Sequence, residues 1–256
     1  MIKPMNKEKN YILIEDGCIY YEIYGTGFPM ILFHGNGESH HNLVPYAKKL
    51  QKEGFQVILM DSRGHGRSEL NFPSFQKKMS AKDMAHDAYI LMKERKLKKA
   101  ILFGFSDGAN TALQFASDYP EFTQEVIAIS PNAGPEGLLL PIRVWVKFAY
   151  NIYNSICEAW HLTKKLDGFL GRCIQKRRFY YSLLLHSPQL TKKKLKNINV
   201  PVLIMAGTRD FIKEEHIRWI SHQISKSQLI FIKGATHLDF YRKMEWYYPF
   251  IRGFVK

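Results

Sequence analysis

A serine stands between two glycines where an apolar run gives way to a helical pattern. Residues 101–110 read ILFGFSDGAN, which places Ser106 in a G-x-S-x-G pattern. Between a strand and a helix this pattern predicts a strained turn that lifts the serine hydroxyl over the start of the helix. The helix dipole and the free N–H groups there favour developing negative charge. We therefore predict that Ser106 is a nucleophile; the alternative is a serine that only caps the helix.

A serine hydroxyl is a poor nucleophile at neutral pH, so it needs an adjacent base, and the base needs an orienting acid. Among ten histidines, His237 lies just past an expected strand at residues 228–234, and Asp210 lies just past another at residues 201–207. Because the carboxyl ends of parallel strands meet at one edge of a sheet, we expect Ser106, Asp210 and His237 to come together. The alternatives are a helix cap for Asp210 and a surface loop for His237.

An acyl-transfer transition state also needs N–H donors for its oxyanion. We expect one donor from the backbone of Asp107, the residue after the serine. We expect the other from Asn36 in the HGNG stretch, which follows an expected strand at residues 30–33. The alternative for HGNG is a glycine-rich turn in which His34 only packs. The acidic side chain of Asp107 either disfavours anionic substrates or points to solvent.

Short apolar segments alternate with helical patterns along the chain, and these elements must position the polar residues. The chain begins with an expected hairpin that turns at Asp16 and Gly17. The further expected strands are residues 30–33, 56–61, 100–103, 125–130, 201–207 and 228–234. The expected helices are residues 39–53, 80–97, 107–119, 213–225 and 238–254. This alternation predicts an α/β fold, with a mostly parallel sheet covered by helices on both faces.

One segment without a strand pattern interrupts the alternation. Residues 136–196 separate two expected strands, and apolar positions recur at helical spacing from Ile142 to Trp160. This segment is far longer than an ordinary connection of about five residues. We expect a helical lid at 136–196, inserted into a core made of residues 1–135 and 197–256, with the whole chain forming a single domain.

The chain resembles the α/β-hydrolase family at five stretches that span nearly all of it except the predicted lid. These are HGNG (34–37), DSRGHGRS (61–68), GFSDG (104–108), GTRD (207–210) and GATH (234–237). The resemblance implies the α/β-hydrolase fold and a reaction through an acyl-enzyme, without a metal or an organic cofactor. It also implies that Asp61, Arg63 and His65 are scaffold residues. The members that act on haloalkanes and epoxides have aspartate at the position of Ser106, so the serine argues against those activities.

These observations predict a serine hydrolase that cleaves a carboxylic ester of a small or acyl-chain substrate. Other acyl bonds (thioester, amide or carbon–carbon) stay open because the same groups would cleave them, and so does a lipase or lysolipase at a lipid surface. A non-catalytic binding protein is less favoured, because no member of the expected triad is missing. The fold hosts many chemistries, so the sequence identifies neither the substrate nor the acyl length, and it leaves the oligomeric state open.

The formal charge of the 256-residue chain is +14, and residues 136–196 contain twelve Lys or Arg against three Asp or Glu. We expect either a solvated basic face or weak contact with an anionic membrane surface. If six basic residues share one face, binding to anionic vesicles should be easy to measure; these are Lys164, Lys165, Arg172, Lys176, Arg177 and Arg178. Nucleic-acid binding is not expected, because no recognised motif accompanies the charge. The N-terminus lacks an apolar signal segment and the three cysteines lack metal-ligand spacing, so we expect a cytoplasmic protein with reduced thiols.

Overall fold

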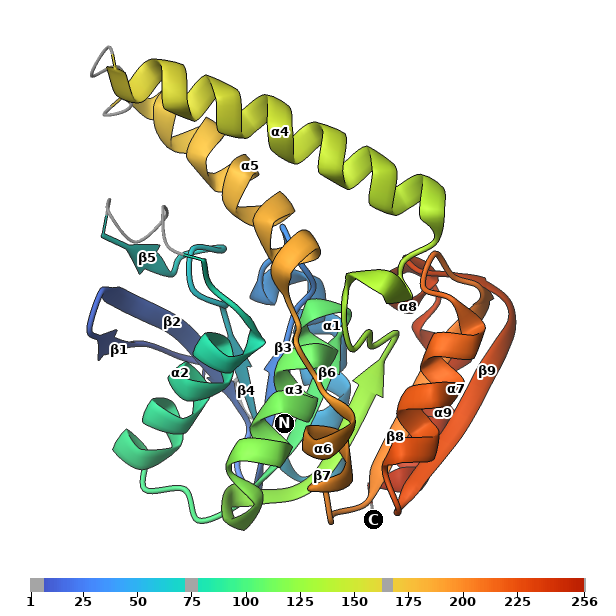
Figure 1. Ribbon diagram of the computed structural model, residues 1–256. Helices are drawn as coiled ribbons and strands as arrows, with labels where there is room; N and C mark the ends of the chain where they lie inside the picture. Colours follow the sequence, from blue (N-terminus) through green and yellow to red (C-terminus); the bar gives the residue numbers. More distant parts are fainter. Residues whose placement is uncertain (1–6, 72–77, 163–167, 256) are drawn as a thin grey trace.

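A mostly parallel β-sheet forms the middle layer of the computed structural model, which describes residues 7–71, 78–162 and 168–255 (Figure 1). The strands are β1 (Lys7–Ile14), β2 (Gly17–Tyr24), β3 (Phe28–Phe33), β4 (Phe55–Met60), β5 (Glu69–Leu70), β6 (Ala100–Phe105), β7 (Thr123–Ile129), β8 (Val202–Arg209) and β9 (Ser227–Thr236). Their order in the described residues is β1-β2-β4-β3-β6-β7-β8-β9, with β5 paired to β2. The first two strands form the predicted antiparallel hairpin, and the pairs from β3–β4 to β8–β9 are parallel. The predicted mostly parallel sheet is therefore confirmed.

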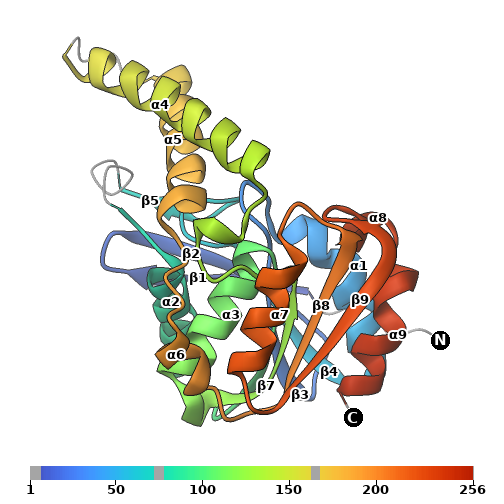
Figure 2. The same cartoon turned by 45° about the vertical axis from the view of Figure 1, so that its right-hand side comes forward.

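Helices cover both faces of the sheet, as Figure 2 shows from the side. One face carries α1 (Val44–Leu50), α8 (Asp239–Arg242) and α9 (Met244–Phe254), and the other carries α2 (Ala81–Glu94), α3 (Asp107–Asp118), α6 (Lys192–Lys196) and α7 (Glu214–Gln223). Leu50 and Ile251 are buried on the first face, and Leu91 and Ile217 on the second. The apolar stripes that predicted these helices are thus the surfaces that they bury against the sheet.

Local signals account for several helix ends. Ser80 caps α2, because its hydroxyl accepts the N–H of Lys82 while the Asp83 carboxylate accepts the N–H of Ser80. Gly54 ends the helical segment before β4 in a left-handed conformation (φ 92°), which glycine adopts without strain. Both ends therefore lie close to their predicted positions.

The prediction of one continuous helix at residues 238–254 is wrong. Lys243 leaves the helical region (φ −130°, ψ 57°) and separates α8 from α9. The break allows Phe240 and Tyr241 to pack around Phe105 while α9 buries Ile251 against the sheet. Tertiary packing at the sheet edge thus outweighs the helical spacing of the sequence.

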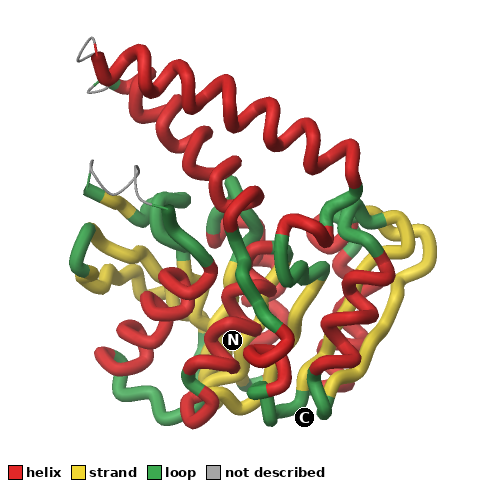
Figure 3. The backbone as a smooth tube through the Cα atoms, in the orientation of Figure 1, coloured by secondary structure: helices red, strands yellow, loops and turns green. Residues whose placement is uncertain are grey.

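The segment between β7 and β8 contains α4 (Leu140–Leu162) and α5 (Phe169–His186), followed by α6. Figures 1 and 3 show α4 and α5 as a helical hairpin that projects from the carboxyl edge of the sheet. Val146, Ala149 and Cys157 are buried positions of α4 and recur at helical spacing. The helix predicted at residues 142–160 is confirmed, whereas its action as a lid stays a prediction. None of the described helices has the length and apolar character needed to cross a bilayer.

Candidate active site

The turn between β6 and α3 holds Ser106 in a conformation that non-glycine residues rarely adopt (φ 53°, ψ −118°). The two flanking glycines make this turn possible. A Cβ atom on Gly104 would lie 2.0 Å from the carbonyl oxygen of Gly108, and one on Gly108 would lie 2.2 Å from that of Phe33. The elbow geometry predicted from GFSDG is therefore present, and both glycines are required by contacts with backbone.

The structure brings the three predicted side chains into one chain of hydrogen bonds. Nδ1 of His237 lies 2.8 Å from Oδ1 of Asp210, and Nε2 of His237 lies 3.1 Å from Oγ of Ser106. With a proton on Nδ1 donated to Asp210, Nε2 is the nitrogen that accepts the serine hydroxyl. All three side chains are at least nine-tenths buried. This arrangement can remove a proton from the serine as it attacks an electrophile.

Asp210 remains a carboxylate because several donors hold it. Burial alone would raise its pKa, but the neighbouring His237 and hydrogen bonds from His237, Ser130 and Ile212 bring it below the ordinary value. The Ser130 hydroxyl donates to Oδ2 over 2.6 Å, and the N–H of Ile212 donates to Oδ1 over 3.0 Å. The charge that orients His237 is therefore present at neutral pH.

Aromatic rings fix the position of the His237 imidazole. The ring of Phe211 lies 3.9 Å from it, between centroids, and the ring of Phe105 lies 4.8 Å from it. The backbone of Phe211 accepts the N–H of Leu139, just before α4, over 2.9 Å. The start of the helical hairpin is thus tied to the residue that covers the histidine.

The HGNG loop lies beside the serine, and its Asn36 side chain contacts Tyr180 and His65. Its Nδ2 donates to the carbonyl oxygen of Tyr180 in α5 over 2.7 Å, and its Oδ1 lies 3.4 Å from Nε2 of His65. Burial lowers the pKa of His65 to about 3, so this ring is neutral, and its one N–H is at Nδ1, which donates to the Arg63 carbonyl over 3.0 Å. His34 lies within the scaffold, where its Nε2 accepts the N–H of Ser62 over 3.0 Å.

The side chain of Asp107 does not point to solvent, so that alternative is wrong. It is 9% exposed, and its Oδ1 accepts a hydrogen bond from Asn110 over 3.2 Å. Its Oδ2 has no hydrogen-bond partner among the described residues. Burial raises the pKa of Asp107 to about 6, although the Asn110 bond opposes this effect. The helix start therefore buries a second acidic group close to the nucleophile.

The DSRGHGRS stretch makes the scaffold contacts that its resemblance implies. Asp61 accepts hydrogen bonds from the backbone N–H groups of His40 and Arg67 over 2.6 and 2.8 Å. Arg63 binds Asp87 in α2 through two hydrogen bonds of 2.8 and 2.5 Å. These bonds hold the loop after β4 against the segment at His40 and against α2. Neither Asp61 nor Arg63 makes a hydrogen bond to Ser106 in them.

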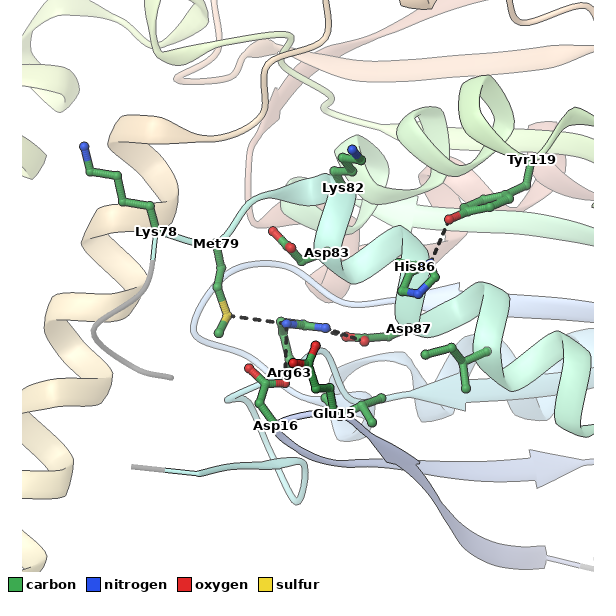
Figure 4. Close-up of a pocket in the computed structure, with 12 residues that line it drawn as sticks. Glu15, Asp16, Arg63, Lys78, Met79, Lys82, Asp83, His86, Asp87 and Tyr119 are labelled. Carbon is green, nitrogen blue, oxygen red and sulfur yellow. Dashed lines mark hydrogen bonds and ion pairs between the residues drawn. The ribbon is translucent and has the colours of Figure 1, made fainter. Parts of the chain in front are cut away.

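A separate cavity of about 390 Å³ lies between the β1–β2 turn and α2 (Figure 4). Arg63 projects into it, bound to Asp87 and 3.8 Å from a carboxylate oxygen of Asp16. Asp83, which also lines it, is engaged as the capping partner of Ser80. Arg63 is thus paired within the cavity, His86 there binds the Tyr119 hydroxyl, and the lining includes no member of the Ser106 triad, so we place no reaction there.

The basic residues of the hairpin do not gather on one face. Arg172 and Lys176 lie one turn apart in α5, but the next two positions, Arg177 and Arg178, are rotated from Lys176 by about 100° and 200°. Arg178 also donates to the side chain of Asn154 in α4 over 3.1 Å. These four residues therefore do not meet the condition of a shared face, and Lys164 and Lys165 lie outside the described residues.

Three contact residues of the site were not predicted from the sequence. Ser130 follows β7 directly, a position that the strand pattern could have marked as facing the sheet edge. Glu38 and Tyr241 approach each other from distant parts of the chain, and their hydrogen bond has no local signal. Asn132, an amide at a position after a strand, binds Asn110 rather than the histidine.

Comparisons with known proteins agree with this fold and site. A family model described as serine aminopeptidase, S33, matches residues 29–185. The serine hydrolase BPHL of Mus musculus is 32% identical over 230 residues, which cover 86% of this chain and 76% of that protein. The proline iminopeptidase of Saccharolobus solfataricus is 23% identical over an alignment that covers 98% of this chain and 93% of that protein.

The structure of the carboxylesterase CesB (YbfK) from Bacillus subtilis matches the fold with a TM-score of 0.73 at 18% identity, covering 98% of this chain and 92% of that chain. At that identity the likeness concerns the fold alone. The family model spans more than half of the chain, and the mouse relative exceeds 30% identity over most of it. The chain is therefore a member of the α/β-hydrolase family and a hydrolytic enzyme.

Proposed function

We propose that this enzyme cleaves carboxylic esters through an acyl-enzyme, with Ser106 as nucleophile, His237 as base and Asp210 as orienting acid. The observation that carries the proposal is the hydrogen-bonded chain from Asp210 through His237 to Ser106, with the serine on a strained elbow. Such a constellation activates a hydroxyl that is otherwise a weak nucleophile.

The proposed reaction proceeds in two halves. His237 takes the hydroxyl proton at Nε2 as Oγ of Ser106 bonds to the carbonyl carbon. The backbone N–H groups of Asn36 and Asp107 donate to the oxyanion; the N–H of Asp107 is one of those that a helix start leaves without an intrahelical acceptor. His237 then gives the proton to the leaving alcohol. Water repeats these steps on the acyl-enzyme and releases the carboxylic acid.

Apolar side chains on α4 support an ester with an acyl chain. Val144, Trp145 and Phe148 are 58%, 56% and 64% exposed, and α4 begins beside the residue that covers His237. Burying such surface against an acyl chain yields about 25 cal/mol per Å². We propose that the α4–α5 hairpin is a lid that receives the acyl part of the substrate, in a cytoplasmic protein.

Amide cleavage is the second candidate. The relative from Saccharolobus solfataricus, which matches 98% of this chain, is named a proline iminopeptidase. The same triad and oxyanion donors would serve an amide, provided that His237 protonates the leaving amine. A comparison of matched ester and anilide substrates decides between the two.

The test combines a serine-directed fluorophosphonate probe with p-nitrophenyl esters of graded chain length and aminoacyl p-nitroanilides. The wild type should react with the probe and hydrolyse esters, and Ser106→Ala should abolish labelling and lower kcat by about 10⁴-fold or more. Ser117→Ala, a buried serine later in α3, serves as the matched control. Faster anilide than ester hydrolysis would favour the peptidase alternative. Labelling that persists in Ser106→Ala would refute the proposed nucleophile.

A further inference from the structure

A carboxylate and a phenol meet beside the loop that carries Asn36. Glu38 and Tyr241 are 203 positions apart in the chain, and the Tyr241 hydroxyl donates to Oε2 of Glu38. The N–H of Gly35 donates to the same Oε2 over 3.1 Å and lies 3.3 Å from the Tyr241 hydroxyl. The pair therefore binds the N–H of the residue before Asn36, which belongs to the His34–Gly35 peptide unit.

The Glu38–Tyr241 pair also contacts the segment that carries His237 and the elbow that carries Ser106. Tyr241 follows His237 by four residues, and its ring packs edge-on against Phe105 with centroids 4.7 Å apart. Phe105 directly precedes Ser106. A Cβ atom on Gly35 would lie 2.8 Å from Oε2 of Glu38 and 3.0 Å from the Phe105 ring, so these groups are in close contact. One cluster thus joins the Asn36 loop, the histidine segment and the serine elbow.

The hydrogen bonds of this cluster restrict the orientation of the Asn36 N–H. The N–H of Gly35 is held by Glu38 and Tyr241, while the Asn36 side chain is held by the Tyr180 carbonyl over 2.7 Å. The Asn36 N–H shares a planar peptide unit with the Gly35 carbonyl, which accepts from Nδ1 of His34 over 2.7 Å and from the Glu38 N–H over 3.3 Å. Hydrogen bonds on both sides of the Gly35 Cα atom therefore limit the direction of the Asn36 N–H. Oxyanion donors work because they are oriented in advance, and a displacement of about 1 Å can lower a rate about 100-fold.

We propose that Glu38 and Tyr241 are positioning residues that aim the Asn36 N–H at the oxyanion and couple that donor to the His237 segment. The inference rests on the proposed esterase function of Ser106. Burial raises the pKa of Tyr241 well above its ordinary value, which keeps the phenol protonated and able to donate. Neither residue needs to touch the substrate.

Three variants and one control test the pair. Glu38→Ala and Tyr241→Phe should each lower kcat by about 10- to 100-fold with KM changed less than about twofold, because the oxyanion exists only in the transition state. Glu38→Gln keeps an oxygen that accepts both hydrogen bonds and should retain most of the activity. The control is Tyr46→Phe, which removes another buried phenol whose bond goes to the Phe240 carbonyl over 2.7 Å. It should retain wild-type kcat.

Two readouts separate positioning from stability. Sulfur accepts weaker hydrogen bonds than oxygen, so the ratio of ester to thionoester rates should fall in Tyr241→Phe and stay unchanged in Tyr46→Phe. Amide exchange of Gly35 and Asn36, followed by NMR, needs no activity and should become faster in Tyr241→Phe and Glu38→Ala but not in Tyr46→Phe. If the wild type hydrolyses no ester, the proposed function fails and the exchange rates alone judge the pair. Wild-type kcat, or unchanged exchange at both amides, in Tyr241→Phe would overturn the inference.

Discussion

Replacing Asp107 with asparagine should change the free energy of unfolding in a pH-dependent way. We expect the variant to gain stability relative to the wild type as the pH rises from 4 to 7. The carboxylate is 9% exposed, and one of its oxygens has no hydrogen-bond partner among the described residues. Burial raises its pKa from 3.8 to about 6, despite the hydrogen bond from Asn110. The folded state therefore binds a proton on Asp107 more tightly than the unfolded state does.

The sign and size of the effect follow from linkage. A pKa raised from 3.8 to about 6 corresponds to about 3 kcal/mol. Between these values the folded state keeps a proton that the unfolded state has released, so the free energy of unfolding decreases as the pH rises. Asparagine carries no such charge. Its stability relative to the wild type should therefore rise by about 2.4 kcal/mol from pH 4 to pH 7, because the unfolded-state carboxyl is already partly ionised at pH 4; this is roughly 5–10 °C in Tm for a chain of this size.

Urea unfolding of both proteins at pH 4, 5, 6 and 7, followed by circular dichroism, measures this change. The new amide can add a pH-independent penalty of about 1–3 kcal/mol if its N–H groups stay unpaired. The decisive quantity is therefore the change of the stability difference with pH, not its value at any one pH. A difference that stays constant from pH 4 to pH 7 would refute a carboxylate held in its neutral form by burial.

Three further predictions concern other charges. Asp239 should behave in the opposite way, because the Thr236 backbone N–H and hydroxyl hold its pKa below the ordinary value. Asp239→Asn should lower the urea midpoint at pH 7, with the loss disappearing as the pH falls through the folded-state pKa; equal loss at all pH values contradicts this. Asp210→Asn should lower kcat for p-nitrophenyl esters by up to about 10⁴-fold, and near-wild-type activity would make Asp210 a helix cap only. If the hairpin contacts anionic lipid, Lys147→Gln and Arg172→Gln should each weaken co-sedimentation with phosphatidylserine vesicles about fivefold at low salt, about 1 kcal/mol per cation; absence of wild-type binding refutes the contact.

The sheet and the Ser106 site were predictable because their signals are local. Gly104 and Gly108 mark an elbow that only glycines allow, and the contacts of absent Cβ atoms show why. Asp210 and His237 each follow an apolar strand, and parallel strands bring their carboxyl ends together. A short pattern and one topological rule therefore suffice to place these groups at the same edge.

Other features depend on contacts between distant segments. Nothing near Glu38 indicates that its carboxylate meets Tyr241, because the contact exists only once the sheet brings α8 beside the loop after β3. The break between α8 and α9 at Lys243 also depends on packing between distant segments. The sequence does not indicate it, because the apolar residues keep their helical spacing on both sides of Lys243. The basic residues of α5 illustrate a different difficulty: clustering in sequence does not make a shared face unless the spacing follows the helical period.

Asp107 shows how two physical effects with opposite signs meet at one residue. An acid in the first turn of a helix is ordinarily favourable, because the N-terminal end of the dipole stabilises negative charge by about 0.3–1 kcal/mol at an exposed site. Removal from water opposes this, and the pKa of about 6 corresponds to a net penalty of about 3 kcal/mol for the charged form. Burial therefore outweighs the dipole. A sequence pattern contains the helix position but not the burial, so the sign of the effect could only come from the packing around Asn110 and Ser106.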